Sequence, residues 1–204
     1  TVEAYCAYGS IFSTTFKSAP TITGDYTVYA GENAGNADKV DAPTNETYTQ
    51  SKYVKIVPIQ TYDVWVGGEQ FTSKKLTING ATGTATYDPD TNTLTLDNFS
   101  YTGEGYNYSS NVGALIYSTG IDLKIVLKGT NTLTGQNYSN GINIYNYDAS
   151  LSISDFVGDD STGVLNIDSN VGIMMTGVSR LILDDVTLNI KSVWAGLNGP
   201  GVTL

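Results

Sequence analysis

The stretch Leu94-Thr-Leu-Asp-Asn-Phe99 returns later in the chain as Leu181-Ile-Leu-Asp-Asp-Val186. Both stretches contain a short unit in which two aliphatic residues flank a third residue. The unit recurs as Leu94/Leu96, Leu123/Ile125, Leu151/Ile153, Leu181/Leu183 and Val202/Leu204. Residues two apart lie on one face of a β-strand, whereas a helix would repeat its apolar residues every three to four positions. The unit therefore predicts a β-strand with one buried face.

Two further units occur between the copies of the first. One reads Val164-Leu-Asn-Ile167 and again Thr187-Leu-Asn-Ile190. The other begins with glycine and continues as an alternating apolar segment, starting at Gly113, Gly141, Gly172 and Gly196. One set of three strands cannot bury its own apolar face, but sets that recur every ~20 to 30 residues can do so by stacking. The sequence thus predicts an all-β fold, a parallel β-helix or β-solenoid.

The repeats also predict which side chains face outward. When the copies of the first unit are aligned at their first aliphatic residue, Leu94 lies opposite Leu123. The aliphatic residues of each copy then face inward. In the glycine unit the same alternation sends Asn143, Tyr117 and Tyr145 outward. We therefore expect Tyr117 and Tyr145 to stack on the outer surface of neighbouring coils.

Three segments are predicted along the chain. Residues 93–204 carry the parallel β-helix coils, truncated at the C-terminal end, and residues 58–92 form a β cap or hairpin with a turn at Asp88-Pro89-Asp90. Because Tyr8-Gly9-Ser-Ile-Phe12 has the form of the glycine unit, residues 1–57 are interpreted as the final coils and connecting cap of a preceding repeat module.

The open end near residues 202–204 carries a further hypothesis. We expect residues 1–24, from the same chain or a neighbour, to cover it, and the intermolecular form would be head-to-tail self-association. Light scattering over a concentration series would contradict that form by finding monomers alone at high concentration.

Charge and histidine content exclude several functions. The 204 residues carry 20 acidic and 10 basic side chains, a net charge of −10, whereas nucleic-acid binding needs clustered Lys and Arg. The sequence contains no histidine, which excludes Ser-His-Asp catalysis and zinc sites built on histidine. No apolar run is long enough to span a bilayer. We therefore expect neither nucleic-acid binding nor membrane insertion.

Three motifs carry a resemblance to a known family. They are Tyr62-Asp-Val-Trp-Val-Gly-Gly68, Tyr87-Asp-Pro-Asp-Thr-Asn-Thr-Leu-Thr-Leu-Asp-Asn98 and Leu127-Lys-Gly-Thr-Asn-Thr-Leu-Thr-Gly135. The chain over residues 60–204 resembles the repeat module of secreted or wall-attached proteins of Gram-positive gut bacteria, labelled carbohydrate-binding-domain-containing or leucine-rich surface proteins. The resemblance implies a right-handed parallel β-helix, an extracellular or cell-wall location, and contact with a polysaccharide or host glycan and with neighbouring repeat modules.

An acid pair could carry catalysis. Asp184 and Asp185 are adjacent carboxylates of the kind that hydrolyse glycosides. However, Asp184-Asp185 occupies the same position in its repeat as Asp97-Asn98 does in the repeat that begins at Leu94. A recurring structural turn is therefore favoured over a catalytic pair. Polygalacturonase-like β-helices also carry Gly-His-Gly and Arg-x-Lys elements, which are absent here. A lyase would need a basic residue beside calcium, and the single arginine, Arg180, is better explained as a surface residue.

No cofactor is expected, with calcium kept as an alternative at two places. Asp88, Asp90 and Asn92 have the first ligand spacings of a calcium loop but lack its glycine and distal glutamate. Asp159 and Asp160 lie in an acidic insertion that could ligate calcium or form a solvated loop. The loop interpretation is favoured for both.

Tyrosine and asparagine crowd together between residues 101 and 147. A sugar packs its apolar face on a tyrosine ring and needs fixed amide partners for its hydroxyls, so this composition suits a saccharide site. The candidate residues are Tyr106, Tyr108, Tyr117, Asn143, Tyr145 and Tyr147. Stacked tyrosines would equally stabilise neighbouring strands by about 0.2 to 1 kcal/mol per pair, and this structural interpretation is favoured.

Two function classes follow. The first is a non-catalytic extracellular surface module, a structural or adhesive repeat with carbohydrate binding as an added role. The alternative is a polysaccharide lyase or hydrolase-like β-helix acting on pectic or related glycans. The absence of histidine and the scarcity of arginine favour the first class.

Overall fold

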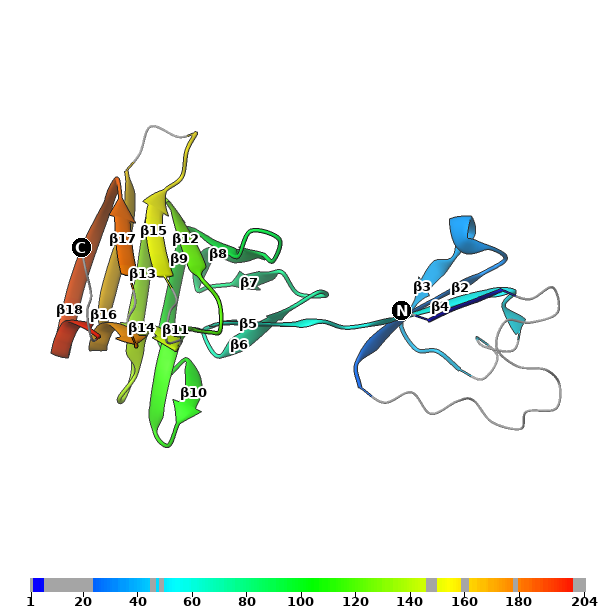
Figure 1. Cartoon of the computed structure of the whole chain (residues 1–204), viewed down its shortest axis with the longest axis horizontal. Helices are drawn as coiled ribbons and strands as arrows, with labels where there is room; N and C mark the ends of the chain where they lie inside the picture. The colour runs from blue at the N-terminus through cyan, green and yellow to red at the C-terminus, as the bar shows by residue number, and fades with distance from the viewer. Residues whose placement is uncertain are drawn as a thin grey trace. The chain divides into compact units, whose positions relative to one another are not determined.

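A computed structural model shows that the chain is all-β, and that it divides into two compact units, Thr1–Gln60 and Thr61–Leu204 (Figure 1). The structure describes residues 2–5, 24–44, 47, 50–145, 150–158, 162–177 and 180–199. Within these residues, no helix has the length and apolar character needed to cross a membrane.

The first unit contains a four-stranded antiparallel sheet. Its strands, in spatial order, are β1 (Val2–Tyr5), β4 (Tyr53–Pro58), β2 (Tyr26–Gly31) and β3 (Asp38–Val40), and a short 3-10 helix spans Ala34–Asn36. Val28, Val54 and Ile56 form its small core. The Tyr8–Phe12 segment, which suggested coils of a preceding module, lies outside the described residues, so that interpretation of residues 1–57 stays a prediction.

The second unit is built from three columns of parallel strands. The first column runs through β9 (Thr93–Gly103), β12 (Leu123–Lys128), β15 (Ser150–Asp155) and β17 (Arg180–Asp184), which lie side by side in Figure 1. The second runs through β9, β13 (Thr130–Gly135), β16 (Gly163–Thr176) and β18 (Val186–Asn198). The third runs through β11 (Val112–Thr119), β14 (Asn140–Tyr145), β16 and β18.

The inward faces of these columns meet in one hydrophobic core. In the first column Leu94, Ile125, Ile153 and Leu181 are all buried, which confirms that this unit points its aliphatic residues inward. Leu183 is the exception at 41% exposed, because β17 has a paired strand on one side only within the described part of the chain.

The predicted register is wrong by two residues in the first repeat. Leu94 pairs with Ile125 instead of Leu123, and Tyr117 pairs with Asn143 instead of Tyr145. The predicted stack of Tyr117 on Tyr145 is therefore absent. A shift of two residues leaves every side chain on the same face, so the hydrophobic pattern alone cannot distinguish the two registers.

The corner between the first two columns marks the observed register. Asn98 and Gly129, with φ angles of 48° and 63°, occupy this corner in successive repeats, and Asp185, with φ 51°, occupies it in the last one. Asn, Gly and Asp are the residues that adopt the left-handed conformation most readily. The left-handed corner residues therefore indicate which residues of neighbouring strands pair, whereas the alternation of apolar and polar residues within the strands does not.

Hairpins cover the first edge of the columns. Their strands are β5 (Thr61–Val66), β6 (Glu69–Thr72), β7 (Thr77–Asn79), β8 (Thr82–Asp88) and β10 (Tyr106–Ser109). Strand β8 pairs antiparallel with β9, while β5 and β10 pair antiparallel with β11. An uncovered sheet edge could pair with another chain, and these hairpins prevent that at the β9 and β11 edges.

A cross-linking experiment can test the observed register. Paired residues of parallel strands are about 4.8 Å apart, whereas diagonal neighbours two residues along are about 8 Å apart, too far for a disulfide. In a Cys6→Ser background we expect Thr93→Cys with Lys124→Cys to oxidise readily, because these residues pair. The Thr95→Cys and Lys124→Cys pair, which the sequence-based alignment sets opposite each other, should remain reduced, as peptide mapping would show. Preferential cross-linking of the second pair would contradict the structure.

Candidate functional site

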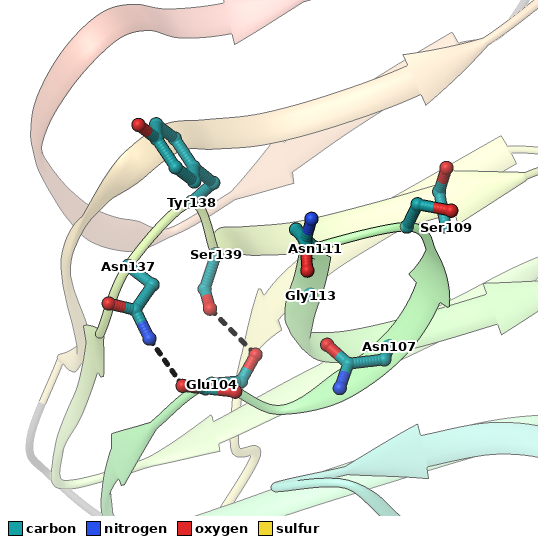
Figure 2. A pocket seen from close by; sticks show the side chains of 9 residues that line it. Glu104, Asn107, Ser109, Asn111, Gly113, Asn137, Tyr138 and Ser139 are labelled. Atoms are coloured by element: carbon teal, nitrogen blue, oxygen red, sulfur yellow. Dashed lines mark hydrogen bonds between the residues drawn. The ribbon is translucent and has the colours of Figure 1, made fainter.

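A polar pocket of about 480 Å³ lies between the β10–β11 hairpin and the turn that joins β13 to β14. Figure 2 shows Asn107, Ser109 and Asn111 on one side of it and Asn137 and Tyr138 on the other, with Glu104 and Ser139 between them. The remaining lining residues are Ser110 and Gly113.

Two glycines bring the backbones of this region close together. A Cβ on Gly105 would lie 2.0 Å from the carbonyl oxygen of Ala114, and a Cβ on Gly113 would lie 2.0 Å from that of Glu104. Gly105 also has φ 72°, which L-residues rarely adopt. Strand β11 can therefore lie this close to residues 104 and 105 only because Gly105 and Gly113 have no side chain.

The opposite wall is a tight turn fixed to the preceding repeat. The Gln136 amide donates to the carbonyl of Gly103 at 2.8 Å, and the Ser139 amide closes the turn onto the Gln136 carbonyl at 3.2 Å. Ser139 Oγ donates to the Glu104 carbonyl at 2.7 Å. Asn137, with φ 55°, takes the left-handed position of the turn. These bonds hold the following residue, Tyr138, 63% exposed at the rim of the pocket.

The lining side chains can both donate and accept hydrogen bonds. Glu104 Oε1 accepts a hydrogen bond from Asn137 Nδ2, and a carboxylate has room for further donors. Glu104 is the single carboxylate among the described lining residues, whereas glycoside hydrolysis usually needs two. An exposed tyrosine ring beside amides and one carboxylate is suited to holding a polyhydroxylated ligand, not to cleaving it.

Three of the predicted glycan-binding tyrosines pack against one another beside Trp65. Tyr106 stacks on Trp65 with ring centroids 4.6 Å apart, and Tyr108 stacks on Tyr117 at 5.3 Å. Burial raises the pKa of both Tyr108 and Tyr117, so their phenols stay neutral at physiological pH. The ring faces in contact with one another cannot also carry a sugar.

None of the predicted glycan-binding residues that the structure describes lines the pocket. The predicted exposure of Tyr117 and Asn143 is wrong, since they are only 8% and 1% exposed. The rings of Trp65, Tyr106 and Tyr108 pack against Tyr117, and Asn143 hydrogen-bonds to the Tyr108 side chain. Tyr145 is 48% exposed but does not line the pocket. Tyr147 lies outside the described residues.

The acid pair Asp184-Asp185 lies at the corner described above. Asp184 ends β17 and Asp185 takes the left-handed corner conformation, as Asn98 does after Asp97. Asp97 forms an ion pair with Lys128 at 2.9 Å, and the hydrogen bond from this lysine lowers the pKa of the Asp97 carboxyl. The corner geometry gives these acids a structural explanation.

The predicted calcium residues serve a hairpin turn where the structure describes them. The carboxylate of Asp88 accepts from the Asp90 amide at 3.0 Å and from the Thr91 hydroxyl at 2.7 Å, and the Thr91 bond lowers its pKa. Asn92 accepts from the Tyr87 hydroxyl at 3.0 Å. Asp159 and Asp160 lie outside the described residues, and the described part of the chain holds no group of three or more acidic, histidine or cysteine side chains placed to bind a metal.

The pocket lies within the Tyr/Asn-rich segment that the sequence singles out, but other side chains of that segment line it. Asn107, Asn111, Asn137 and Tyr138 belong to the Tyr/Asn-rich run, yet their convergence depends on a turn stacking on a hairpin from the repeat before. Nothing in the sequence marks Glu104 as a binding residue, because single acidic residues are common in loops. The two left-handed asparagines, which mark tight turns on both sides of the pocket, were the available clue.

Comparison with family models, with curated proteins and with solved structures finds no match for this chain. Its function is therefore inferred from the chemistry of the pocket, because a fold alone does not determine function.

Proposed function

We propose that this chain is a non-catalytic extracellular surface module that binds carbohydrate in the pocket between Glu104 and Tyr138. The observation that carries the proposal is the exposed ring of Tyr138 held beside Asn137 and Glu104. A sugar ring can pack on the tyrosine while its hydroxyls bond to the amides and the carboxylate. The single carboxylate in the lining supports binding over the alternative, a pectic lyase or hydrolase.

The proposal includes the architecture and setting of the module. The three parallel columns support a right-handed parallel β-helix over residues 93–198, with the hairpins of residues 61–88 as its cap. The resemblance to repeat modules of Gram-positive surface proteins supports a cell-wall location and an adhesive or spacer role beside neighbouring modules. A surface rich in Thr, Asn and Tyr, with few charges, is consistent with that setting.

Replacing Tyr138 with alanine tests the proposed site. Once a glycan array has identified a ligand, we expect Tyr138→Ala to weaken its binding about tenfold, because loss of the ring removes the stacking surface. The melting temperature should stay within about 2 °C, since an exposed side chain contributes little to stability. Isothermal titration calorimetry and thermal denaturation would measure the two effects.

Tyr145→Ala is the informative comparison, because Tyr145 is exposed but lies outside the pocket. It should bind the same glycan like the unmodified chain. Binding lost in Tyr145→Ala and retained in Tyr138→Ala would move the site away from the pocket. Turnover of a pectic substrate in a reducing-sugar or unsaturated-product assay, abolished by Asp184→Asn, would establish the enzymatic alternative instead.

A further inference from the structure

The charge of the pocket limits which sugars it can accept. Its lining contains the carboxylate of Glu104 and no lysine or arginine among the nine described residues. The remaining groups are the amides of Asn107, Asn111 and Asn137, three serine hydroxyls and the ring of Tyr138. Nothing in the lining can neutralise an anionic ligand.

Two lysines of the same unit pair with acidic residues outside the pocket lining. Lys128 pairs with Asp97 at 2.9 Å and Lys191 pairs with Asp168 at 2.6 Å. The chain as a whole carries a net charge of −10. A uronic-acid saccharide would place a second carboxylate near Glu104, and no lysine or arginine of the described lining would compensate it.

Coulomb's law gives the size of this effect. Two unit charges about 4 Å apart change an affinity about fivefold when water screens them, and by a larger factor at the lower effective dielectric of a protein surface. An interaction of 1.4 kcal/mol changes affinity about tenfold. The same Glu104 carboxylate would attract a sugar ammonium group by a comparable amount.

We propose that the pocket selects amino sugars with a free ammonium group, accepts neutral sugars more weakly and rejects uronic acids. This inference rests on the proposed carbohydrate-binding function and adds the class of ligand. The carboxylate of Glu104 determines this order of affinities. Asn137 Nδ2 donates a hydrogen bond to Glu104 Oε1, and the carboxylate can accept further donors. The amides and hydroxyls bind sugar hydroxyls of any class and do not discriminate.

Three tetrasaccharides of equal length test the order: a glucosamine tetramer, an N-acetylglucosamine tetramer and tetragalacturonate. By calorimetry at low salt and pH 6, we expect the glucosamine tetramer to bind about fivefold tighter than the N-acetylated one. Tetragalacturonate should bind at least about tenfold more weakly than the N-acetylated one. The glucosamine advantage should shrink at high salt, because ions screen an exposed charge.

Glu104→Gln isolates the charge while keeping a hydrogen-bond acceptor. In this variant the three affinities should fall within about threefold of one another. Asp90→Asn, which removes an exposed carboxylate outside the pocket, should keep the original order. If the oligosaccharides bind without this order, or tetragalacturonate binds best, the inference is wrong and carbohydrate binding stands. If none of the three binds and no other glycan does, the proposed function fails, and the inference fails with it.

Discussion

Gly105→Ala should lower the free energy of unfolding of the second unit by about 2 to 5 kcal/mol. A left-handed backbone costs an L-residue about 1 to 2 kcal/mol, and forcing a methyl group into a packed site costs about 1 to 3 kcal/mol more. The added Cβ would lie 2.0 Å from the Ala114 carbonyl oxygen, so either β11 or the 104–105 segment must move. The melting temperature should fall by about 5 to 15 °C.

Gly120→Ala is a matched control for the backbone conformation. Gly120 has φ 74°, close to the 72° of Gly105, but nothing lies within 4 Å of a Cβ built on it. It should therefore show only the left-handed cost of about 1 to 2 kcal/mol. Trp65 and Trp194 both belong to the second unit, so tryptophan fluorescence during denaturation reports on this unit alone. Equal destabilisation by the two substitutions would show that the close approach at Gly105 is not a constraint.

Asn131→Leu should destabilise the same unit by about 2 to 3 kcal/mol, although the residues at the equivalent position of the next two repeats are leucines. Asn131 is fully buried in an inward column, where it pairs with Leu165, which in turn pairs with Leu188. Its Oδ1 accepts from the buried amide of Phe99 at 2.8 Å, and its Nδ2 lies 3.3 Å from the Lys128 carbonyl. Leucine would remove the acceptor of the buried Phe99 amide, which alone costs about 1 to 3 kcal/mol, and would also remove the donor to the Lys128 carbonyl.

Asn189→Leu provides the contrast for Asn131→Leu. Asn189 lies in the same column of strands but is exposed, and its side-chain amide donates to Asn166 Oδ1 at 2.9 Å. Its replacement should change stability by less than about 0.5 kcal/mol. A gain in stability from Asn131→Leu would show that column hydrophobicity outweighs the hydrogen bonds at the corner.

The strands of the second unit were predictable because their signal is local. Alternation of apolar and polar residues shows the inward face of each strand, and Leu94, Ile125 and Ile153 are buried as predicted. The exceptions occur where a neighbouring element changes the environment. Tyr117 and Asn143 alternate as outward residues should, but the Tyr106 and Tyr108 side chains of the neighbouring strand β10 contact them, and both are buried.

The candidate site was less predictable because it joins segments from different repeats. Glu104 follows β9, whereas Asn137 and Tyr138 belong to a turn in the next repeat, and a two-residue change of register would separate them. The prediction that Tyr117 and Tyr145 form one binding surface requires a register that the structure does not have, because Tyr117 pairs with Asn143. A count of tyrosines cannot show which rings pack together and which stay exposed.

The sequence by itself determined the strand class, the parallel repeat of aliphatic positions and the recurring corner of Asp97 and Asp184, because each depends on residues close together in the chain. Tertiary structure alone decided the register, the burial of the aromatic cluster and the pocket beside Tyr138. These features depend on which backbones come within a few ångströms of each other. Gly105 and Gly113, which have no Cβ, and the buried Asn131 determine how closely these backbones approach. The periodic pattern of apolar residues does not identify these three residues.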